Sequence, residues 1–293
     1  MLLSAIKEND NNETRVSISP ESVKLFSRLG FEVIIENGAG ETSGYQNSNY
    51  EEAGAKIVTR SECLKADVCL CVRMPSTDDI NNLKSNSLLI GILNPYENKS
   101  QFSNLNKNKI SSCCMELIPR ISRAQSMDVL SSQANLAGYR SVIDAAEQFG
   151  KAFPMMMTAA GRVNPAKVMI LGVGVAGLQA IATAKRLGAV VSATDVRAAT
   201  KEQVESLGGK FIMVEDDEAQ NAETAGGYAK EMSEDYKKKQ AQLIAETVSK
   251  QDIVICTALI PGKKAPVLIT EEMVSSMIPG SVVIDLAVEA GGN

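Results

Sequence analysis

Short apolar runs alternate with amphipathic stretches along the first third of the chain. The apolar runs have the length of strands, and we expect strands at residues 2–7, 32–36, 56–59, 67–73 and 88–93. A proline begins the stretch 20–29 and Gly30 follows it, which predicts a helix; further helices are expected at 78–85 and 99–106. Strands that alternate with helices are typical of a parallel α/β sheet.

The same alternation returns in the second half of the chain, with strands expected at 167–171, 190–195, 210–214, 252–258 and 281–286. The stretch 215–250 separates the third of these strands from the fourth. An insertion of that length is typical of a functional or a disordered segment. Since a complete doubly wound sheet has six strands, we expect the second domain to be incomplete at its C-terminal end.

A long helical pattern joins the two series. It covers residues 126–149, with Ser126 as its cap and Gly150 after its end, and the proline-containing stretch 151–167 suggests a linker. We therefore predict an α/β protein of two Rossmann-like or flavodoxin-like parallel-sheet domains, 1–125 and 167–293. The helix and linker at 126–166 connect them, and a cleft is expected between them.

The composition is that of an ordinary globular protein, with 44% apolar and 22% charged residues in 293. The net charge of -5 argues against nucleic acid as a partner, because nucleic-acid binding needs a basic face. No apolar run approaches the roughly 18 residues that span a bilayer, and the N-terminus does not resemble a signal peptide. We therefore expect a soluble chain.

Histidine is absent and the six cysteines form no C-x-x-C pair. The absence of histidine excludes histidine metal sites, serine–histidine and cysteine–histidine nucleophile pairs, and the commonest general acid or base. The cysteines are expected to be reduced core thiols, as in a cytosolic protein. We expect no metal site, and any enzymatic chemistry must proceed without an imidazole.

The clearest motif is a G-x-G-x-x-G sequence formed by Gly172, Gly174 and Gly177, between a predicted strand and a predicted helix. The first glycine permits a tight turn, the second a close approach of a pyrophosphate, and the third close packing of helix against strand. The helix start, which includes Val175 and Ala176, offers free N–H groups to phosphate.

Asp195 ends the next strand, eighteen residues after Gly177. A carboxylate in that place can accept hydrogen bonds from the adenosine ribose and would repel a 2′-phosphate. This predicts NAD(H) rather than NADP(H) as the bound cofactor, although Arg197, two residues further on, weakens the argument. Hydride transfer between two nicotinamides changes no proton at the reacting carbons, so it suits a protein without histidine.

Several segments together resemble the proton-translocating nicotinamide nucleotide transhydrogenases, in particular their NAD(H)-binding domain, which is related to alanine dehydrogenase. The segments are 13–21, 120–139, the glycine motif, 225–232, 257–262 and 285–293. The resemblance covers essentially the whole chain, and the block 120–131 is its most specific segment.

The resemblance implies roles for individual residues. Those matching the loop that holds the nicotinamide are Arg120, Gln125, Asp128 and Ser131, and the match of Gln125 also reaches toward NADP(H). Those matching other NAD(H) contacts are Asp195, Val196, Arg197, Thr257, Ala258 and Leu259, and Tyr228 matches a tyrosine of a loop that closes over the nucleotide.

The resemblance also implies partners and a location. NADP(H) would be bound by a separate domain, and a further domain in the membrane would carry protons, both on other chains. The chain would form a homodimer at the cytoplasmic or matrix-side face of the inner membrane, as a peripheral component.

Simpler roles for the same residues remain open. Arg120 and Asp128 could form an ordinary surface ion pair at a helix start. Gln125 and Ser131 could be capping or surface groups, and Tyr228 a solvent-exposed loop aromatic.

Two other functions also remain open. The first is an amino acid dehydrogenase of the alanine type. Arg15 matches a substrate-binding arginine of those enzymes, but Arg73 stands where they have a lysine and no histidine follows. The second is a module that binds NAD(H) without catalysis. Pyruvate-dependent oxidation of NADH would separate the first alternative from hydride exchange between nicotinamides.

Overall fold

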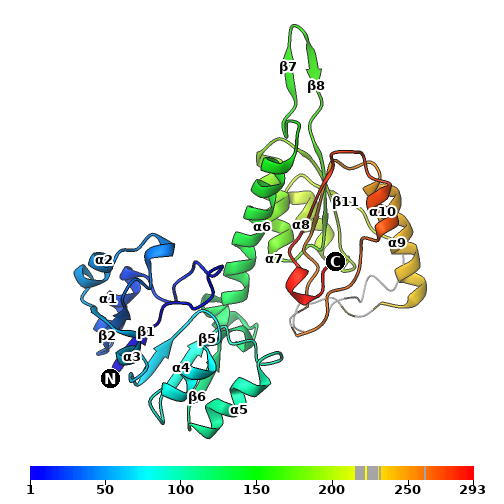
Figure 1. Cartoon of the computed structure of the whole chain (residues 1–293). Coiled ribbons are helices and arrows are strands. Elements are labelled where there is room, and N and C mark those ends of the chain that lie inside the picture. Colours follow the sequence, from blue (N-terminus) through cyan, green and yellow to red (C-terminus); the bar gives the residue numbers. More distant parts are fainter. Residues whose placement is uncertain (215–221, 223–229, 231, 261) are drawn as a thin grey trace. The chain divides into compact units, whose positions relative to one another are not determined.

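The computed structural model describes residues 1–214, 222, 230, 232–260 and 262–293 (Figure 1). The described chain divides into two compact units, Met1–Val129 and Leu130–Asn293. Each unit is built on a parallel sheet, as expected from the alternation of strands and helices.

The first unit contains a six-stranded sheet in the order β3-β2-β1-β4-β5-β6, and all neighbouring strands are parallel. The strands are β1 (Leu2–Ala5), β2 (Glu32–Glu36), β3 (Lys56–Val58), β4 (Val68–Leu70), β5 (Leu88–Gly91) and β6 (Ser111–Cys114). This is the doubly wound order, in which the direction of winding reverses between β1 and β4.

Helices cover both faces of the first sheet. They are α1 (Pro20–Arg28), α2 (Asn47–Glu52), α3 (Arg60–Cys63), α4 (Thr77–Asn82) and α5 (Lys99–Lys107), and short 3-10 helices lie at Glu41–Ser43, Met115–Leu117 and Ser122–Met127. One core layer includes Leu3, Val23 and Tyr50, so α1 and α2 share a face. The other includes Cys63, Ile80 and Leu105, so α3, α4 and α5 cover the opposite face.

The second unit contains a five-stranded parallel sheet in the order β11-β10-β9-β12-β13. Its strands are β9 (Lys167–Leu171), β10 (Val190–Thr194), β11 (Lys210–Phe211), β12 (Ile253–Cys256) and β13 (Val282–Asp285). The winding reverses between β9 and β12, as it does between β1 and β4. Both units are therefore Rossmann-like.

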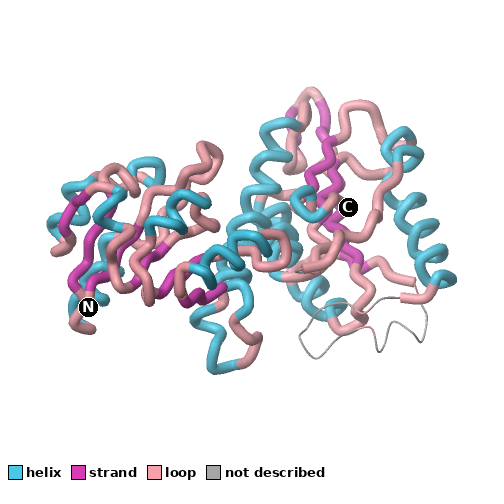
Figure 2. Tube along the Cα trace, turned by 60° about the horizontal axis from the view of Figure 1, so that its bottom comes forward, coloured by secondary structure: helices cyan, strands magenta, loops and turns pink. Residues whose placement is uncertain are grey.

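The helices of the second unit again lie on two faces of the sheet (Figures 1 and 2). They are α6 (Val129–Gln148), α7 (Val175–Arg186), α8 (Thr200–Ser206), α9 (Glu234–Val248), α10 (Glu271–Ser275) and a 3-10 helix at Val288–Ala290. Val142, Ile181 and Val204 belong to one core layer, so α6, α7 and α8 share a face. Ile244 and Met273 place α9 and α10 on the other face.

Two local expectations were wrong. The long helix was expected to start at Ser126, but α6 starts at Val129, because residues Ser122–Met127 form a 3-10 helix instead. The stretch 151–167, expected to be a linker, contains an antiparallel hairpin of β7 (Met156–Thr158) and β8 (Gly161–Val163). All six strand residues of the hairpin are exposed, so no core pattern marks them in the sequence.

Two expectations are not tested by the structure. Tyr228 lies outside the described residues, as does most of the stretch 215–231. The second sheet has five strands within the described residues, and the missing sixth strand stays a prediction. None of the helices in the described regions of the chain combines the length and the apolar character needed to cross a membrane.

Candidate functional site

The glycine motif forms a tight connection between β9 and α7. Gly172 has a φ of +95°, which favours glycine, and a Cβ added there would lie 2.9 Å from the backbone nitrogen of Ala258. A Cβ added at Gly177 would lie 2.0 Å from the carbonyl oxygen of Gly172. The strand end, the turn and the first turn of α7 are therefore packed too closely for side chains at these two positions.

Gly174 differs from its two neighbours in the motif. It precedes the start of α7 in an extended conformation, and a Cβ added there would meet no atom within 4 Å. The N–H groups of the first helical turn, at Val175, Ala176 and Gly177, have no partner within the helix. Open space beside unpaired donors at a helix start is what a phosphate group requires.

Asp195 follows β10 and is 8% exposed. Its Oδ2 accepts hydrogen bonds from the Val173 N–H at 2.7 Å and from Nη2 of Arg197 at 2.7 Å. Its Oδ1 accepts from the backbone N–H and Nε of Arg197, both at 2.9 Å. A carboxylate has about four lone-pair sites. A ribose hydroxyl can thus bind Asp195 only if one of these donors moves aside.

The segment after β12 carries three more of the predicted cofactor-binding residues. Thr257 donates its hydroxyl to the Gly172 carbonyl at 2.8 Å and so connects this segment to the glycine turn. Ala258 lies within van der Waals reach of the same turn. Leu259 follows Ala258 and has 43% of its surface exposed.

Asn293 is a residue that the sequence reasoning did not place in the site. Its side-chain amide accepts from the Ala258 N–H at 3.0 Å and donates to the carbonyls of Ala258 and Pro266, both at 2.8 Å. Its own N–H donates to Asp285 at 2.7 Å. Asn293 therefore anchors both ends of the segment 258–266, and only the three-dimensional structure reveals this role.

Gly138 is a second residue that the sequence reasoning missed. It lies in the middle of α6, and a Cβ added there would lie 2.1 Å from the carbonyl oxygen of Ala176. Asn135, one turn earlier, donates to Gln179 of α7 at 3.2 Å. The helix α6 thus crosses directly over the start of α7, and a helix-interior glycine was the available signal.

A cavity of about 520 Å³ opens at the carboxyl ends of β9, β10 and β12. Gly172, Asp195 and Ala258 line it, together with side chains of α9 and of the segment after β12. Its lining includes the apolar residues Val196, Met232, Ile244, Ile260, Val267 and Leu268 and four exposed lysines, Lys230, Lys237, Lys263 and Lys264.

The cavity and the glycine turn fit a dinucleotide. Ligands of open parallel sheets bind at the carboxyl ends of the strands where the winding reverses, which is where this cavity lies. Its volume is in the range of small-molecule sites, apolar walls suit a base, and lysines suit phosphates. In the described residues, no three histidine, cysteine, aspartate or glutamate side chains lie together as a metal site requires.

The predicted nicotinamide-binding residues fall on either side of the division between the units. In the first unit, Nε of Arg120 lies 3.8 Å from Oδ2 of Asp128. Gln125 belongs to the 3-10 helix before α6, and its carbonyl accepts the Asp128 N–H at 3.2 Å. Ser131 lies in the first turn of α6, in the second unit.

A carboxylate–arginine cluster occupies the carboxyl ends of the first sheet. Glu13 pairs with Arg15 at 2.7 Å and with Arg73 at 2.8 Å. The hydrogen bond from Arg15 is the main cause that lowers the pKa of Glu13 to about 2. Both arginines that invite comparison with an amino acid site therefore hold a carboxylate of the protein itself.

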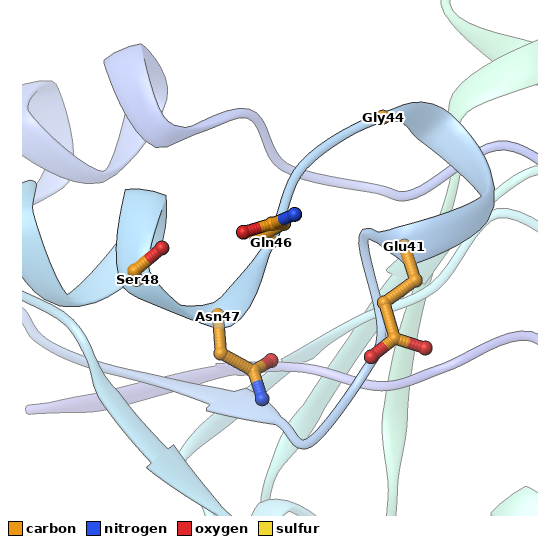
Figure 3. A pocket seen from close by; sticks show the side chains of 5 residues that line it. All are labelled: Glu41, Gly44, Gln46, Asn47 and Ser48. Carbon is orange, nitrogen blue, oxygen red and sulfur yellow. The ribbon is translucent and has the colours of Figure 1, made fainter.

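A second cavity in the first unit has no comparable chemistry. It is lined by Glu41, Gly44, Gln46, Asn47 and Ser48 (Figure 3). Asn47 accepts the Gly38 N–H at 3.0 Å, and Gln46 forms the capping box of α2. The polar groups beside this cavity thus stabilise the turn and the helix end.

Comparisons with known proteins agree with this geometry. Residues 4–137 match the family described as "Alanine dehydrogenase/PNT, N-terminal domain", and residues 141–293 match "Alanine dehydrogenase/PNT, C-terminal domain". The chain belongs to the alanine dehydrogenase/PNT family. The two matches meet within α6.

Proteins named as transhydrogenases and proteins named as alanine dehydrogenases are both similar to this chain. It is 60% identical over 300 residues to the first portion of the divided NAD(P) transhydrogenase alpha subunit of Rhodospirillum rubrum, covering 100% of this chain and 78% of the relative. A solved transhydrogenase structure from Sinorhizobium meliloti is 53% identical, with a TM-score of 0.89, and the match covers 100% and 80%. Alanine dehydrogenase of Bacillus subtilis is 30% identical over 299 residues, covering 100% and 72%.

Proposed function

We propose that this chain is the NAD(H)-binding component of a proton-translocating NAD(P) transhydrogenase. NAD(H) binds in the second unit, and hydride passes directly between it and NADP(H) on a partner domain. The observation that carries the proposal is the 60% identity to a transhydrogenase alpha subunit along the whole chain. The glycine turn and the cavity beside Asp195 support it, because they fit a dinucleotide.

The residues of this chain would divide the work of binding. The nicotinamide supplies the hydride acceptor or donor. The N–H groups at the start of α7 receive the pyrophosphate, and Asp195 receives the adenosine ribose after Arg197 shifts. Arg120, Gln125, Asp128 and Ser131 orient the nicotinamide. Tyr228, which lies outside the described residues, is proposed to close over the nucleotide.

No residue of this set has to accept a proton, because NADH and NADP⁺ exchange only a hydride. The contribution of the chain is position and electrostatic support. This explains why a chain without histidine is suited to the reaction.

The partners belong to the same proposal. An NADP(H)-binding domain and a membrane proton-channel domain on other chains complete the enzyme, and this chain lies peripherally on the cytoplasmic or matrix side. A homodimer is supported by the β7–β8 hairpin, which is exposed and carries Met156, Met157 and Val163. Exposed apolar side chains gathered on one projecting element are typical of a contact between subunits.

The amino acid dehydrogenase alternative rests on the similarity to alanine dehydrogenase and on Arg15. The position of Glu13 argues against this alternative, because its carboxylate forms ion pairs with both Arg15 and Arg73. A substrate carboxylate would have to displace a buried, strongly paired group. The absence of histidine also removes the proton-transfer residue expected in that chemistry.

An oxidation assay with three arms tests the proposal. NADH is given to the chain with pyruvate and ammonium, with an NADP⁺-loaded partner domain, or alone. We expect NADH oxidation only with the partner domain. Oxidation with pyruvate would instead support the amino acid dehydrogenase, and NADH binding without oxidation in any arm would support a binding module.

A further inference from the structure

Another cavity of the second unit lies at the amino ends of the strands, whereas the glycine turn lies at their carboxyl ends. Its volume is about 330 Å³, which is within the range of small-molecule sites. It is lined by Lys167, Val190 and Lys210, the first residues of β9, β10 and β11, and by the end of α9. The cavity is therefore separate from the one beside Asp195.

The floor of this cavity belongs to the face of the sheet on which α9 packs. Because side chains alternate between the faces of a strand, Lys167 shares a face with Met169, which belongs to the core layer of α9. Val190 is in register with Lys167 and is 56% exposed. Ser192, on the same face of β10, is in register with Lys210. A lysine of each neighbouring strand thus flanks this part of β10.

The charges of the cavity favour an anion. Lys167, Lys210 and Lys250 line it and form no ion pair within the described part of the chain. The acidic residue of the lining is Glu246, and its carboxylate accepts a hydrogen bond from Gln242 at 3.0 Å. Three lysines against one glutamate make the cavity basic, in a chain whose net charge is -5. Charge complementarity therefore selects a negatively charged ligand.

Gln251 adds a buried polar group to the lining. It is only 8% exposed, and its Nε2 donates to the Thr247 carbonyl at 3.2 Å. An amide has two N–H donors and a carbonyl acceptor. The second N–H and the carbonyl oxygen of Gln251 have no partner among the residues that the structure describes. Since buried polar groups are normally satisfied, the unused N–H can bind an oxygen of a ligand.

The end of α9 and the apolar lining restrict the kind of anion. A helix C-terminus carries about half a unit of negative charge, which favours a singly charged group over a doubly charged phosphate. The last carbonyls, at Thr247 and Val248, accept N–H groups at 3.1 and 3.0 Å, so they need no ligand. Val190, Ile212 and the methylene stems of the lysines supply apolar surface. A carboxylate attached to an apolar chain fits this combination.

We propose that this cavity binds a small organic acid, a monocarboxylate with an apolar chain. The chain lies on Val190 and Ile212, and the carboxylate binds the lysine ammonium groups and the free N–H of Gln251. The proposal does not depend on the proposed function, because the two cavities share no residue of their described linings.

The test measures binding of octanoate by isothermal titration calorimetry, with and without saturating NADH. Octanamide has the same chain without the charge, and acetate has the charge without the chain. The wild type is compared with the double variant Lys210→Gln/Lys250→Gln. The matched control is Lys201→Gln/Lys238→Gln, which removes the same charge from two exposed lysines that line neither cavity of the second unit.

We expect the wild type and the control to bind one octanoate per chain, about tenfold more tightly than octanamide or acetate, and equally well with NADH present. The Lys210→Gln/Lys250→Gln variant should lose about three- to tenfold in octanoate affinity and none in octanamide affinity.

Four results would overturn the proposal. They are a wild type that does not bind octanoate, octanamide binding as tight as octanoate binding, displacement of octanoate by NADH, and equal octanoate affinity in the two double variants. Displacement by NADH would place octanoate in the cavity beside Asp195 instead.

Discussion

The two sheets of this chain have the same winding, and the same backbone arrangement recurs at the point where each reverses. Ala5 is in register with Ile35, and Leu171 with Thr194, so Glu36 and Asp195 follow at equivalent positions. The N–H of Lys7 donates to Glu36 at 2.8 Å, and the N–H of Val173 donates to Asp195 at 2.7 Å. The repeat therefore extends from topology to individual hydrogen bonds.

An arginine completes the arrangement in each unit. Arg60 donates to the Glu36 carboxylate at 2.8 Å and to the Lys7 carbonyl at 2.9 Å. Arg197 donates to the Asp195 carboxylate at 2.7 Å and to the Val173 carbonyl at 3.1 Å. Arg60 lies at the start of α3, whereas Arg197 follows β10. The contact therefore results from the similar geometry of the strand ends and not from a similar sequence.

The units differ at the third residue after the first strand of each sheet. In the first unit this is Glu8, whose carboxylate accepts the N–H groups of Val72 at 2.7 Å and Arg73 at 3.0 Å. In the second it is Gly174, beside open space. The corresponding position therefore holds a carboxylate in the first unit, bound to the N–H groups that follow β4, and the glycine before α7 in the second. The side chain of Glu8 fills the space there in the first unit, and Gly174 leaves it open in the second.

The largest effect is expected when Gly177, in the glycine turn of the second unit, is replaced. A methyl group there would meet the Gly172 carbonyl oxygen at 2.0 Å, so Gly177→Ala should abolish NADH binding and lower the free energy of unfolding by about 1–3 kcal/mol. Urea unfolding and NADH titration measure both. Gly150→Ala is the control, because a Cβ at that position meets no atom within 4 Å. Unchanged NADH binding in Gly177→Ala would show that the turn does not form the site.

The cluster of Glu13 with Arg15 and Arg73 should make the stability of the first unit depend on pH in the acid range. A carboxyl pKa lowered from 4.5 to about 2 means that Glu13 stabilises the fold above pH 4.5 and loses this contribution as the pH falls toward 2. The contribution is about 1–3 kcal/mol, since its arginine partners are partly exposed.

Urea unfolding of the wild type and of Glu13→Gln between about pH 6 and about pH 2.5 measures this contribution. The difference between the two proteins should shrink through that window. A difference that stays constant with pH would mean that the ion pairs of Glu13 do not stabilise the unit.

The smallest effect is expected when the side chain of Glu8 is removed. Glu8→Gly should leave the N–H groups of Val72 and Arg73 without their carboxylate and cost about 1 kcal/mol of stability. Inorganic phosphate should then raise the unfolding temperature of the variant more than that of the wild type. An equal response of both proteins to phosphate would contradict the comparison between Glu8 and Gly174.

The sequence predicted the strands best where apolar side chains are buried on both faces. The bounds of β2 and β9 agree with expectation, because Val33 and Ile35 or Val168 and Ile170 repeat a regular pattern. The edge strand β6 was missed, since Ser111 and Ser112 are exposed. The hairpin was missed for the same reason.

The site was predictable where a backbone constraint demands one residue type. Gly172 and Gly177 could be recognised because no other residue fits their turn. Asn293 could not, because its position depends on contacts between segments far apart in the sequence. In the sequence, Arg197 was likewise only a charge two residues from Asp195, and the hydrogen bonds between the two side chains could not be predicted.

Direct hydride transfer is the central claim, and an isotope experiment tests it. NADH carrying deuterium at the transferring carbon is mixed with this chain and an NADP⁺-loaded partner domain, and the NADPH formed is analysed by mass spectrometry. The account predicts deuterium in NADPH that requires this chain and is lost in Asp128→Ala. Unlabelled NADPH, or no NADPH from a chain shown to bind NADH, would contradict it.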